Sequence, residues 1–167
     1  MISVQTDSPM RADVQLLLAE HLSDMYATSP ADSVHALDHS ALAAAGITFY
    51  TAREHGLLLG CGALKHLSRH EAEIKSMRTA APARRRGVAD LLLSRIIAEA
   101  AAKGYERVSL ETGTEDYFAA ARRLYQRHRF EECAPFGTYV PDPHSTFMSL
   151  TLSPSNLNSF AGSRKDT

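Results

Sequence analysis

The amino-acid sequence predicts an α/β (α+β) fold built around a mixed sheet. Apolar residues recur at helical spacing in three separate segments, and short strand-like runs lie between and after these segments. Three of the strand-like runs follow one another with only short polar turns between them, which favours an antiparallel meander. The 167 residues are enough for one domain with its own core, which we expect over residues 1–152.

The chain is expected to begin with a strand and a helix. Residues 2–4 alternate as in a short strand, and residues 10–25 carry apolar side chains at spacings of three and four, as in an amphipathic helix. Residues 28–40 follow as a loop rich in turn residues. In this loop Asp38 is a candidate cap for a short helix that ends by Ala45.

The meander occupies the next part of the chain. Its strands are expected at "ITFYTARE" (47–54), "LLLGCGALKHL" (57–67) and "EAEIKSMRTA" (71–80). Gly60 and Gly62 lie inside the second strand and have no side chain to pack. They mark either a β-bulge or a position where another part of the molecule approaches the backbone closely, and both interpretations stay open.

The second half of the chain alternates helix and strand. After Pro82 the apolar period lengthens to that of a helix over residues 87–103, and Gly104 supplies its stop. Residues 153–167 carry few apolar side chains, and we expect a flexible C-terminal tail there. Between helix and tail we expect a buried strand, a helix and two closing strands, at "ERVSLET" (106–112), "YFAAARRLYQRH" (117–128), "RFEEC" (129–133) and "STFMSLTL" (145–152).

Composition and charge exclude several classes of protein. Lys and Arg number 18 against 19 Asp and Glu, and a net charge of -1 argues against a broad nucleic-acid surface. No apolar stretch reaches the roughly 18 to 20 residues needed to span a bilayer, so we expect a cytoplasmic protein without a membrane partner. Two cysteines do not make a disulfide framework. Two histidine pairs have a spacing of four, His35 with His39 and His66 with His70, but neither has a predicted third ligand nearby, and no metal site is expected.

The segment "RRRGVAD" (84–90) concentrates positive charge where a helix is expected to begin. The first backbone N–H groups of a helix have no partner within it and carry partial positive charge, so such a position attracts anions. Gly87 lets a ligand lie against the backbone, and the preceding arginines can add charge-assisted contacts to phosphate oxygens. The glycine patterns of P-loop and dinucleotide-binding proteins are absent. The segment therefore indicates a diphosphate site, with a basic helix start that binds nothing as the alternative.

This segment resembles the Q/R-x-x-G-x-G/A signature of the GNAT superfamily, the acyl-CoA-dependent N-acetyltransferases. The resemblance extends to "EIKSMRTAAPARRRGVADLLL", "VSLETG" and "ARRLYQRHRF", which look like the fourth strand, signature loop and third helix, the fifth strand, and the following helix of that family. It covers residues 2–152. It implies a mixed, mostly antiparallel sheet of about six to seven strands flanked by about four helices.

The resemblance also implies acetyl-CoA as the cosubstrate. In the family, backbone amides of the signature loop hold the diphosphate of the cofactor, and the pantetheine arm lies beside the fourth strand. The corresponding residues here are Met77, Arg78, Thr79, Arg84, Arg85, Arg86, Gly87, Val88, Ala89 and Asp90.

Two positions depart from the family pattern. Thr112 stands where many members have an asparagine that contacts the cofactor arm, and its hydroxyl or backbone is the expected substitute. Arg129 stands where the family usually has a glycine before the phenylalanine. A left-handed backbone kept at that position would cost an arginine about 1 kcal/mol.

An N-acetyltransferase needs a deprotonated amine, a polarised carbonyl and a proton for the departing thiolate. The resemblance assigns the proton donor to Tyr125, since family members often carry a tyrosine on this helix. Glu73 is the candidate general base, with Glu71 and Glu111 as alternatives, and a structural role is open for each carboxylate. Strand alternation is expected to put Glu73 and Met77 on the same face of the sheet.

The expected acceptor is the primary amine of a small molecule, which attacks the thioester directly in a ternary complex. In the family the variable loops border the acceptor cleft, here residues 28–40 and 136–144. Candidate substrate contacts are Ser33, His35 and Asp38. A homodimer is compatible with the resemblance, because many relatives are dimers. The alternative from another functional class is a non-catalytic acyl-CoA-binding module.

Overall fold

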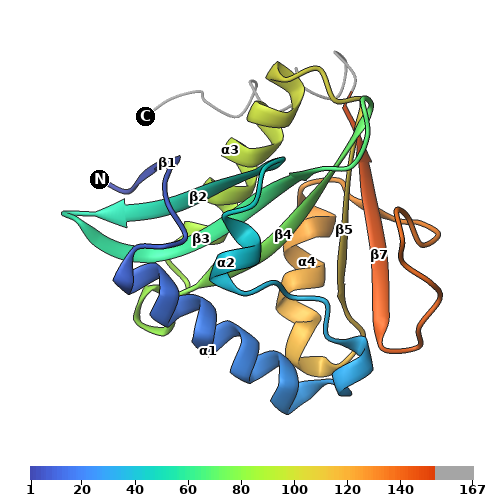
Figure 1. The fold of residues 1–167 in the computed structure, drawn as a ribbon, viewed down its shortest axis with the longest axis horizontal. Coiled ribbons are helices and arrows are strands. Elements are labelled where there is room, and N and C mark those ends of the chain that lie inside the picture. The colour runs from blue at the N-terminus through green and yellow to red at the C-terminus, as the bar shows by residue number, and fades with distance from the viewer. Residues whose placement is uncertain (153–167) are drawn as a thin grey trace.

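One mixed sheet of seven strands forms the centre of the molecule, in the order β1-β2-β3-β4-β5-β7-β6 (Figure 1). The structure is a computed structural model that describes residues 1–152, so the tail expected at 153–167 lies outside the described residues. Neighbouring strands are antiparallel except β4 and β5, which are parallel, and the predicted mixed sheet with its central meander is confirmed. The strands are β1 (Ser3–Thr6), β2 (Ile47–Glu54), β3 (Leu57–His66), β4 (Glu71–Thr79), β5 (Arg107–Gly113), β6 (Glu131–Glu132) and β7 (Ser145–Thr151).

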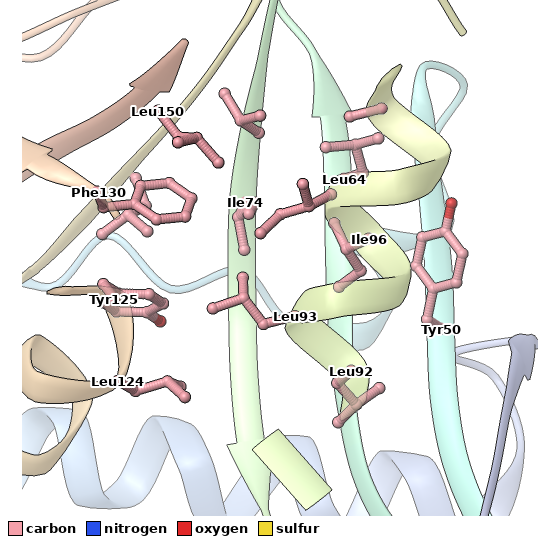
Figure 2. Packing of buried hydrophobic residues seen from close by; sticks show 14 of the residues in the cluster. Tyr50, Leu64, Ile74, Leu92, Leu93, Ile96, Leu124, Tyr125, Phe130 and Leu150 are labelled. Atoms are coloured by element: carbon pink, nitrogen blue, oxygen red, sulfur yellow. The ribbon is translucent and has the colours of Figure 1, made fainter. Parts of the chain in front are cut away.

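Four α-helices cover the two faces of the sheet. They are α1 (Ala12–Thr28), α2 (His39–Leu42), α3 (Val88–Ala102) and α4 (Ala119–Arg127), with short 3-10 turns at Ala31–Ser33, Ala81–Ala83 and Asp116–Phe118. Apolar side chains of α1 and α2 pack on one face, and those of α3 and α4 pack on the other in a larger core that includes Ile74 and Leu110 (Figure 2). Within residues 1–152, the helices are all too short or too polar to cross a bilayer.

Several predicted helix ends are confirmed. The Asp38 carboxylate accepts a hydrogen bond from the backbone N–H of Ala41 at 2.8 Å, which caps α2. Gly104 has a φ of 86° just beyond α3, as expected of a glycine that ends a helix. Arg129 has a φ of 68°, so the left-handed turn that glycine makes in the family is kept here by an arginine.

Gly60 and Gly62 are required by close approach of other atoms. A Cβ at Gly60 would lie 2.8 Å from the carbonyl oxygen of Arg78, and one at Gly62 would lie 2.5 Å from the sulfur of Met77. A β-bulge is also present beside them, because the register of β3 against β4 shifts between Cys61 and Ala63. Both interpretations of the glycine pair are therefore correct.

The bulge changes which face β4 presents. Ser76 has a φ of 56°, and the two residues Ser76 and Met77 stand opposite Gly62. Beyond this point the alternation of side chains is shifted by one, so Met77 packs against the α3 core while Glu73 faces the opposite side. The predicted common face for Glu73 and Met77 was wrong, because strict alternation does not hold through a bulge.

The parallel strands β4 and β5 separate along their length. Their pairing covers only Glu71 to Glu73 against Arg107 to Ser109, although β4 continues to Thr79 and β5 to Gly113. Figure 1 shows the two strands side by side at one end and wide apart at the other, with α4 behind the opening. One edge of β4 beyond residue 73 consequently has no strand partner from β5, which leaves its backbone hydrogen-bonding groups available.

Candidate functional site

A cavity of about 610 Å³ occupies the opening between β4 and β5. Its floor comes from the separated parts of the two strands, residues 73–79 and 111–113. One end reaches the start of α3 and the side of α4, and the other reaches the α1–α2 connection and the loop before β7. The separation of two neighbouring strands therefore produces a continuous channel across the sheet.

The first end of the cavity is formed by the loop that leads into α3. Gly87 is the N-cap of this helix and has a φ of 76°, and Arg85 has a φ of 65°. Left-handed backbone is strained for arginine and easy for glycine, and such strain is common at binding loops. Of the predicted loop contacts, those that line the cavity are Arg84, Arg85, Gly87, Val88, Ala89 and Asp90.

Arg86 does not belong to this end of the cavity. Its guanidinium lies 2.6 Å from the carboxylate of Glu54 at the end of β2, so it holds the loop against the β2–β3 hairpin. The predicted role of Arg86 as a cofactor contact is corrected for this reason. Arg123 and Arg127 of α4 line the cavity instead. Neither was predicted as a contact, although a spacing of four on a helix places both on one face.

The charge of Asp90 is balanced by the last turn of α4. His128 Nε2 lies 2.9 Å from one carboxylate oxygen of Asp90, and an Arg127 nitrogen lies 3.4 Å from the other. An acidic side chain in the first turn of a helix is normally stabilising there but would repel an anionic ligand. The contacts of Asp90 with Arg127 and His128 offset this repulsion, so this end of the cavity is more favourable for phosphate than it would be with an unpaired Asp90.

The middle of the cavity is lined by four other residues for which cofactor contacts were predicted, Met77, Arg78, Thr79 and Thr112. Arg78 also forms an ion pair with Asp24 of α1 at 2.7 Å. Three buried polar atoms on cavity residues have no hydrogen-bond partner among the described residues, His21 Nδ1, Ser76 Oγ and Arg78 Nε. Burial, and then the charge of Arg78, lower the pKa of His21 to about 4, so its ring is neutral at physiological pH.

Glu73, Lys75 and Tyr139 form a hydrogen-bonded group at the second end. The Lys75 ammonium lies 3.1 Å from Glu73 Oε2 and 2.9 Å from the Tyr139 hydroxyl, which itself donates to Glu73 Oε2. The side chains of Glu73 and Lys75 are only 4% and 8% exposed. Burial and the Glu73 charge raise the pKa of Tyr139 well above its usual value, so this phenol stays protonated. No local pattern around Tyr139 predicts that its hydroxyl reaches Glu73.

Glu111 lies on the neighbouring strand and lines the same cavity. Burial raises the pKa of its carboxyl to about 7, although the Ser145 hydroxyl and the Lys75 ammonium oppose the rise. A carboxyl group that titrates near neutrality inside a cavity is typical of general acid–base chemistry. The two carboxyl groups at this end of the cavity therefore differ in their contacts: Glu73 is hydrogen-bonded to Lys75 and Tyr139, whereas Glu111 has a raised pKa.

Tyr125 lies on α4, on the other side of the opening from Glu111. It is 7% exposed, its ring packs edge-on against Phe130 at 5.8 Å, and it lines the cavity (Figure 2). Burial, and then the charge of Glu111, raise the pKa of the Tyr125 phenol above its usual value. The phenol is therefore protonated at neutral pH and has a proton to donate.

Two loops meet over the second end of the cavity. The Ser33 hydroxyl donates to the Asp142 carboxylate at 2.6 Å, and the ring of His35 meets that of Tyr139 edge-on at 5.0 Å. Ser33 and His35, two of the predicted substrate contacts, both line the cavity. Asp38 does not line it, since its carboxylate is used to cap α2, and its predicted substrate contact is corrected.

The cavity lies where the sheet opens between two parallel strands, with a helix start and its arginines at one end and titratable groups at the other. This arrangement is that of an acyltransferase of the acyl-CoA-dependent class. Residues 14–130 match the model of the acetyltransferase (GNAT) family. The chain belongs to this family and is an acetyl-CoA-dependent acyltransferase.

Comparison with known proteins agrees over nearly the whole chain. The N-acetyltransferase YedL of Escherichia coli (strain K12) is 46% identical over 156 residues, which cover 93% of this chain and 98% of YedL. A solved structure from Klebsiella pneumoniae, described as an acyl-CoA N-acyltransferase, has 25% identity and a TM-score of 0.74, with 92% of this chain and 99% of that one covered. A GNAT acetyltransferase from Elizabethkingia anophelis, solved with acetyl-CoA bound, shares the fold at 18% identity and a TM-score of 0.62, with 90% and 98% covered.

Proposed function

We propose that the protein transfers the acetyl group of acetyl-CoA to the primary amine of a small molecule, by direct attack in a ternary complex. The observation that carries the proposal is the single cavity that joins the start of α3 to Glu73 and Glu111 through the opening between β4 and β5. A cofactor that enters from the helix end and an amine that enters from the other end would meet in that opening.

The cavity suits acetyl-CoA at its helix end. The diphosphate would accept hydrogen bonds from the backbone N–H groups at the start of α3, with Arg84 and Arg85 beside it. The pantetheine amides would pair with the free edge of β4 at residues 77–79, where β5 supplies no partner. The fold neighbour from Elizabethkingia anophelis that holds acetyl-CoA supports this assignment for the family.

Tyr125 is the proposed proton donor to the departing thiolate of CoA. Its position on α4 and its access to the cavity put the phenol on the cofactor side of the opening. The thiolate needs a proton as the carbon–sulfur bond breaks, and a phenol held in its protonated form by burial can supply it.

The second end of the cavity favours a small acceptor. The contacts of Ser33 with Asp142 and of His35 with Tyr139 join two loops above Glu73 and Lys75, so the space beneath them is roofed. A site that is partly covered in this way favours a compact amine. His35 and Ser33 are the proposed acceptor contacts.

The proposal is tested by two measurements on the purified protein. Calorimetric titration with acetyl-CoA should show saturable binding, and release of the CoA thiol should depend on a primary amine from a panel of alkyl, aromatic, amino-acid and polyamine compounds. Binding without amine-dependent thiol release would identify a non-catalytic acyl-CoA-binding module instead. Failure of both would contradict the assignment of the cavity.

A further inference from the structure

Two carboxyl groups on adjacent strands, the buried Glu73 and the half-buried Glu111, line the acceptor end of the cavity. We infer that Glu111, and not Glu73, takes the proton that the acceptor amine loses during acetyl transfer; this inference rests on the proposed function. Glu73 is instead a positioning residue that fixes Lys75 and Tyr139.

The contacts of Glu73 make it a poor base. Its Oε2 atom accepts hydrogen bonds from both Lys75 and Tyr139, and its side chain is 4% exposed. Because two donors already occupy this oxygen, an approaching amine would have to displace one of them to reach it. A proton taken by Glu73 would leave the Lys75 ammonium buried without its counter-charge.

Glu111 is placed where an attacking amine would need a base. Leu110 packs in the core on the α3 and α4 side of the sheet, so Glu111 points to the opposite face, which is the acceptor side. Tyr125 packs in the same core as Leu110 and reaches the cavity from that side. The opening between β4 and β5 therefore lies between a base on one face and an acid on the other.

The groups around Glu111 act in opposing directions. Glu73 on β4 and Asp142 in the loop before β7 disfavour its charge, whereas Lys75 on β4 and Ser145 on β7 favour it. Burial outweighs them, and the pKa of Glu111 rises to about 7. The carboxylate is then both ionised above neutral pH and basic enough to accept a proton.

The proton balance of the reaction follows from this arrangement. The amine nitrogen attacks the thioester carbonyl, a carbon–nitrogen bond forms, and the nitrogen loses one proton to the Glu111 carboxylate. The carbon–sulfur bond breaks and the sulfur takes the proton of the Tyr125 phenol. Solvent then carries a proton from Glu111 to Tyr125, which restores both groups. The net products are an amide and CoA with its thiol.

The acid and the base are electrostatically coupled. The negative charge of Glu111 contributes to the raised pKa of Tyr125. When Glu111 is protonated by the amine, this contribution disappears and the pKa of Tyr125 falls. Removal of the first proton thus makes the second transfer easier, at the moment when the thiolate forms.

The test measures kcat/KM against pH for the best amine of the panel, at saturating acetyl-CoA, in matched variants. We expect the wild type to lose activity below about pH 7, in addition to the dependence due to protonation of the amine itself. Glu111→Gln should lower kcat/KM by about 10²-fold or more above neutral pH and abolish the fall below it, whereas Glu111→Asp should restore part of both. An unchanged acetyl-CoA affinity and an unchanged thermal unfolding temperature would show that the variants fold.

Substitutions of the neighbours of Glu111 supply a second measurement, the pH at which activity falls. This pH would not change if Glu111 had only a structural role. Glu73→Gln should keep the fall in activity but shift it to lower pH, because Lys75 then acts on Glu111 without opposition. Lys75→Met should shift it to higher pH. If instead Glu73→Gln abolishes the fall and Glu111→Gln keeps it, Glu73 is the base and the inference is overturned; a wild type that acetylates no amine overturns the proposed function and the inference with it.

Discussion

The two ends of the cavity are built in different ways. The helix end comes from one short segment, residues 84–90 without Arg86, in which Arg85 and Gly87 have left-handed conformations, and its proposed binding groups are mainly backbone amides. The acceptor end gathers Glu73, Glu111 and Tyr139 from three elements, and the hydrogen bond from Tyr139 to Glu73 spans 66 positions of the chain. A site made of consecutive backbone groups depends on local conformation, whereas a site made of distant side chains depends on the whole fold.

The largest effect is expected at the glycine of the helix end. Gly87→Glu should weaken acetyl-CoA binding by at least about 10²-fold, because it combines a strained left-handed φ with a negative charge at the phosphate site. Gly87→Ala is the matched control: its added Cβ meets no atom within 4 Å, so only strain of about 1 kcal/mol remains. Calorimetric dissociation constants check both, and equal losses from the two variants would show that charge plays no part.

The next effect concerns the acid on the cofactor side. Tyr125→Phe should reduce kcat by about 10²-fold while the dissociation constant of acetyl-CoA changes little, because the phenol acts only when the thiolate forms. Steady-state kinetics with the best amine of the panel provide the measurement. Undiminished turnover would remove Tyr125 from the mechanism.

A smaller effect separates the arginines of the loop. Arg85→Ala should weaken acetyl-CoA binding by about tenfold, since a charge-assisted contact is lost while the backbone site remains. Arg86→Ala should change it by less than about twofold, because Arg86 is paired with Glu54 away from the cavity. Calorimetry at two salt concentrations tests the pair. A loss at Arg86 as large as at Arg85 would contradict the geometry of the loop.

The acceptor end should also reveal itself in stability. The pKa of Glu111 is higher in the folded protein, about 7, than its ordinary value of 4.5, so the folded state binds more protons between these values. The contribution of this group to the free energy of unfolding therefore decreases as pH rises from about 4.5 to 7. Urea unfolding should show that Glu111→Gln becomes more stable relative to the wild type as the pH rises from about 5 to 8. A difference that does not depend on pH would contradict the raised pKa.

A modest effect on the amine alone is expected where the two loops meet over the acceptor. Ser33→Ala removes the hydrogen bond to Asp142 and should raise KM for the amine by about fivefold, with KM for acetyl-CoA unchanged. Initial rates with either substrate varied provide the check. An equal rise in both values would mean that the contact supports the fold as a whole.

The sequence was sufficient for the fold and for most of the helix end. The meander, α3 and its glycine start follow from residue spacing and turn chemistry, and these are local properties. The cofactor contact predicted for Arg86 was wrong because the sequence does not distinguish it from the two arginines before it. Only the ion pair with Glu54, seen in the structure, separates Arg86 from them. Local conformation could be predicted, but the direction of each side chain could not.

The acceptor end required the structure. The glycine pair on β3 indicated a possible bulge, but the sequence of β4 does not show that the extra residue lies at Ser76, where it reverses the alternation before Met77. Tyr139 lies in a loop without a periodic apolar pattern. Its hydrogen bond to Glu73, which distinguishes the contacts of Glu73 from those of Glu111, could therefore not be predicted from the sequence. Asp38 was predicted both as a helix cap and as a substrate contact, and the structure uses its carboxylate for the cap.

The central claim is that both ends of one cavity act together, with cofactor and amine bound at the same time. Initial rates of CoA release, measured while acetyl-CoA and the amine are both varied, test this directly. The account predicts double-reciprocal lines that intersect, as direct transfer in a ternary complex requires. Parallel lines would indicate a covalent acetyl-enzyme and would contradict it.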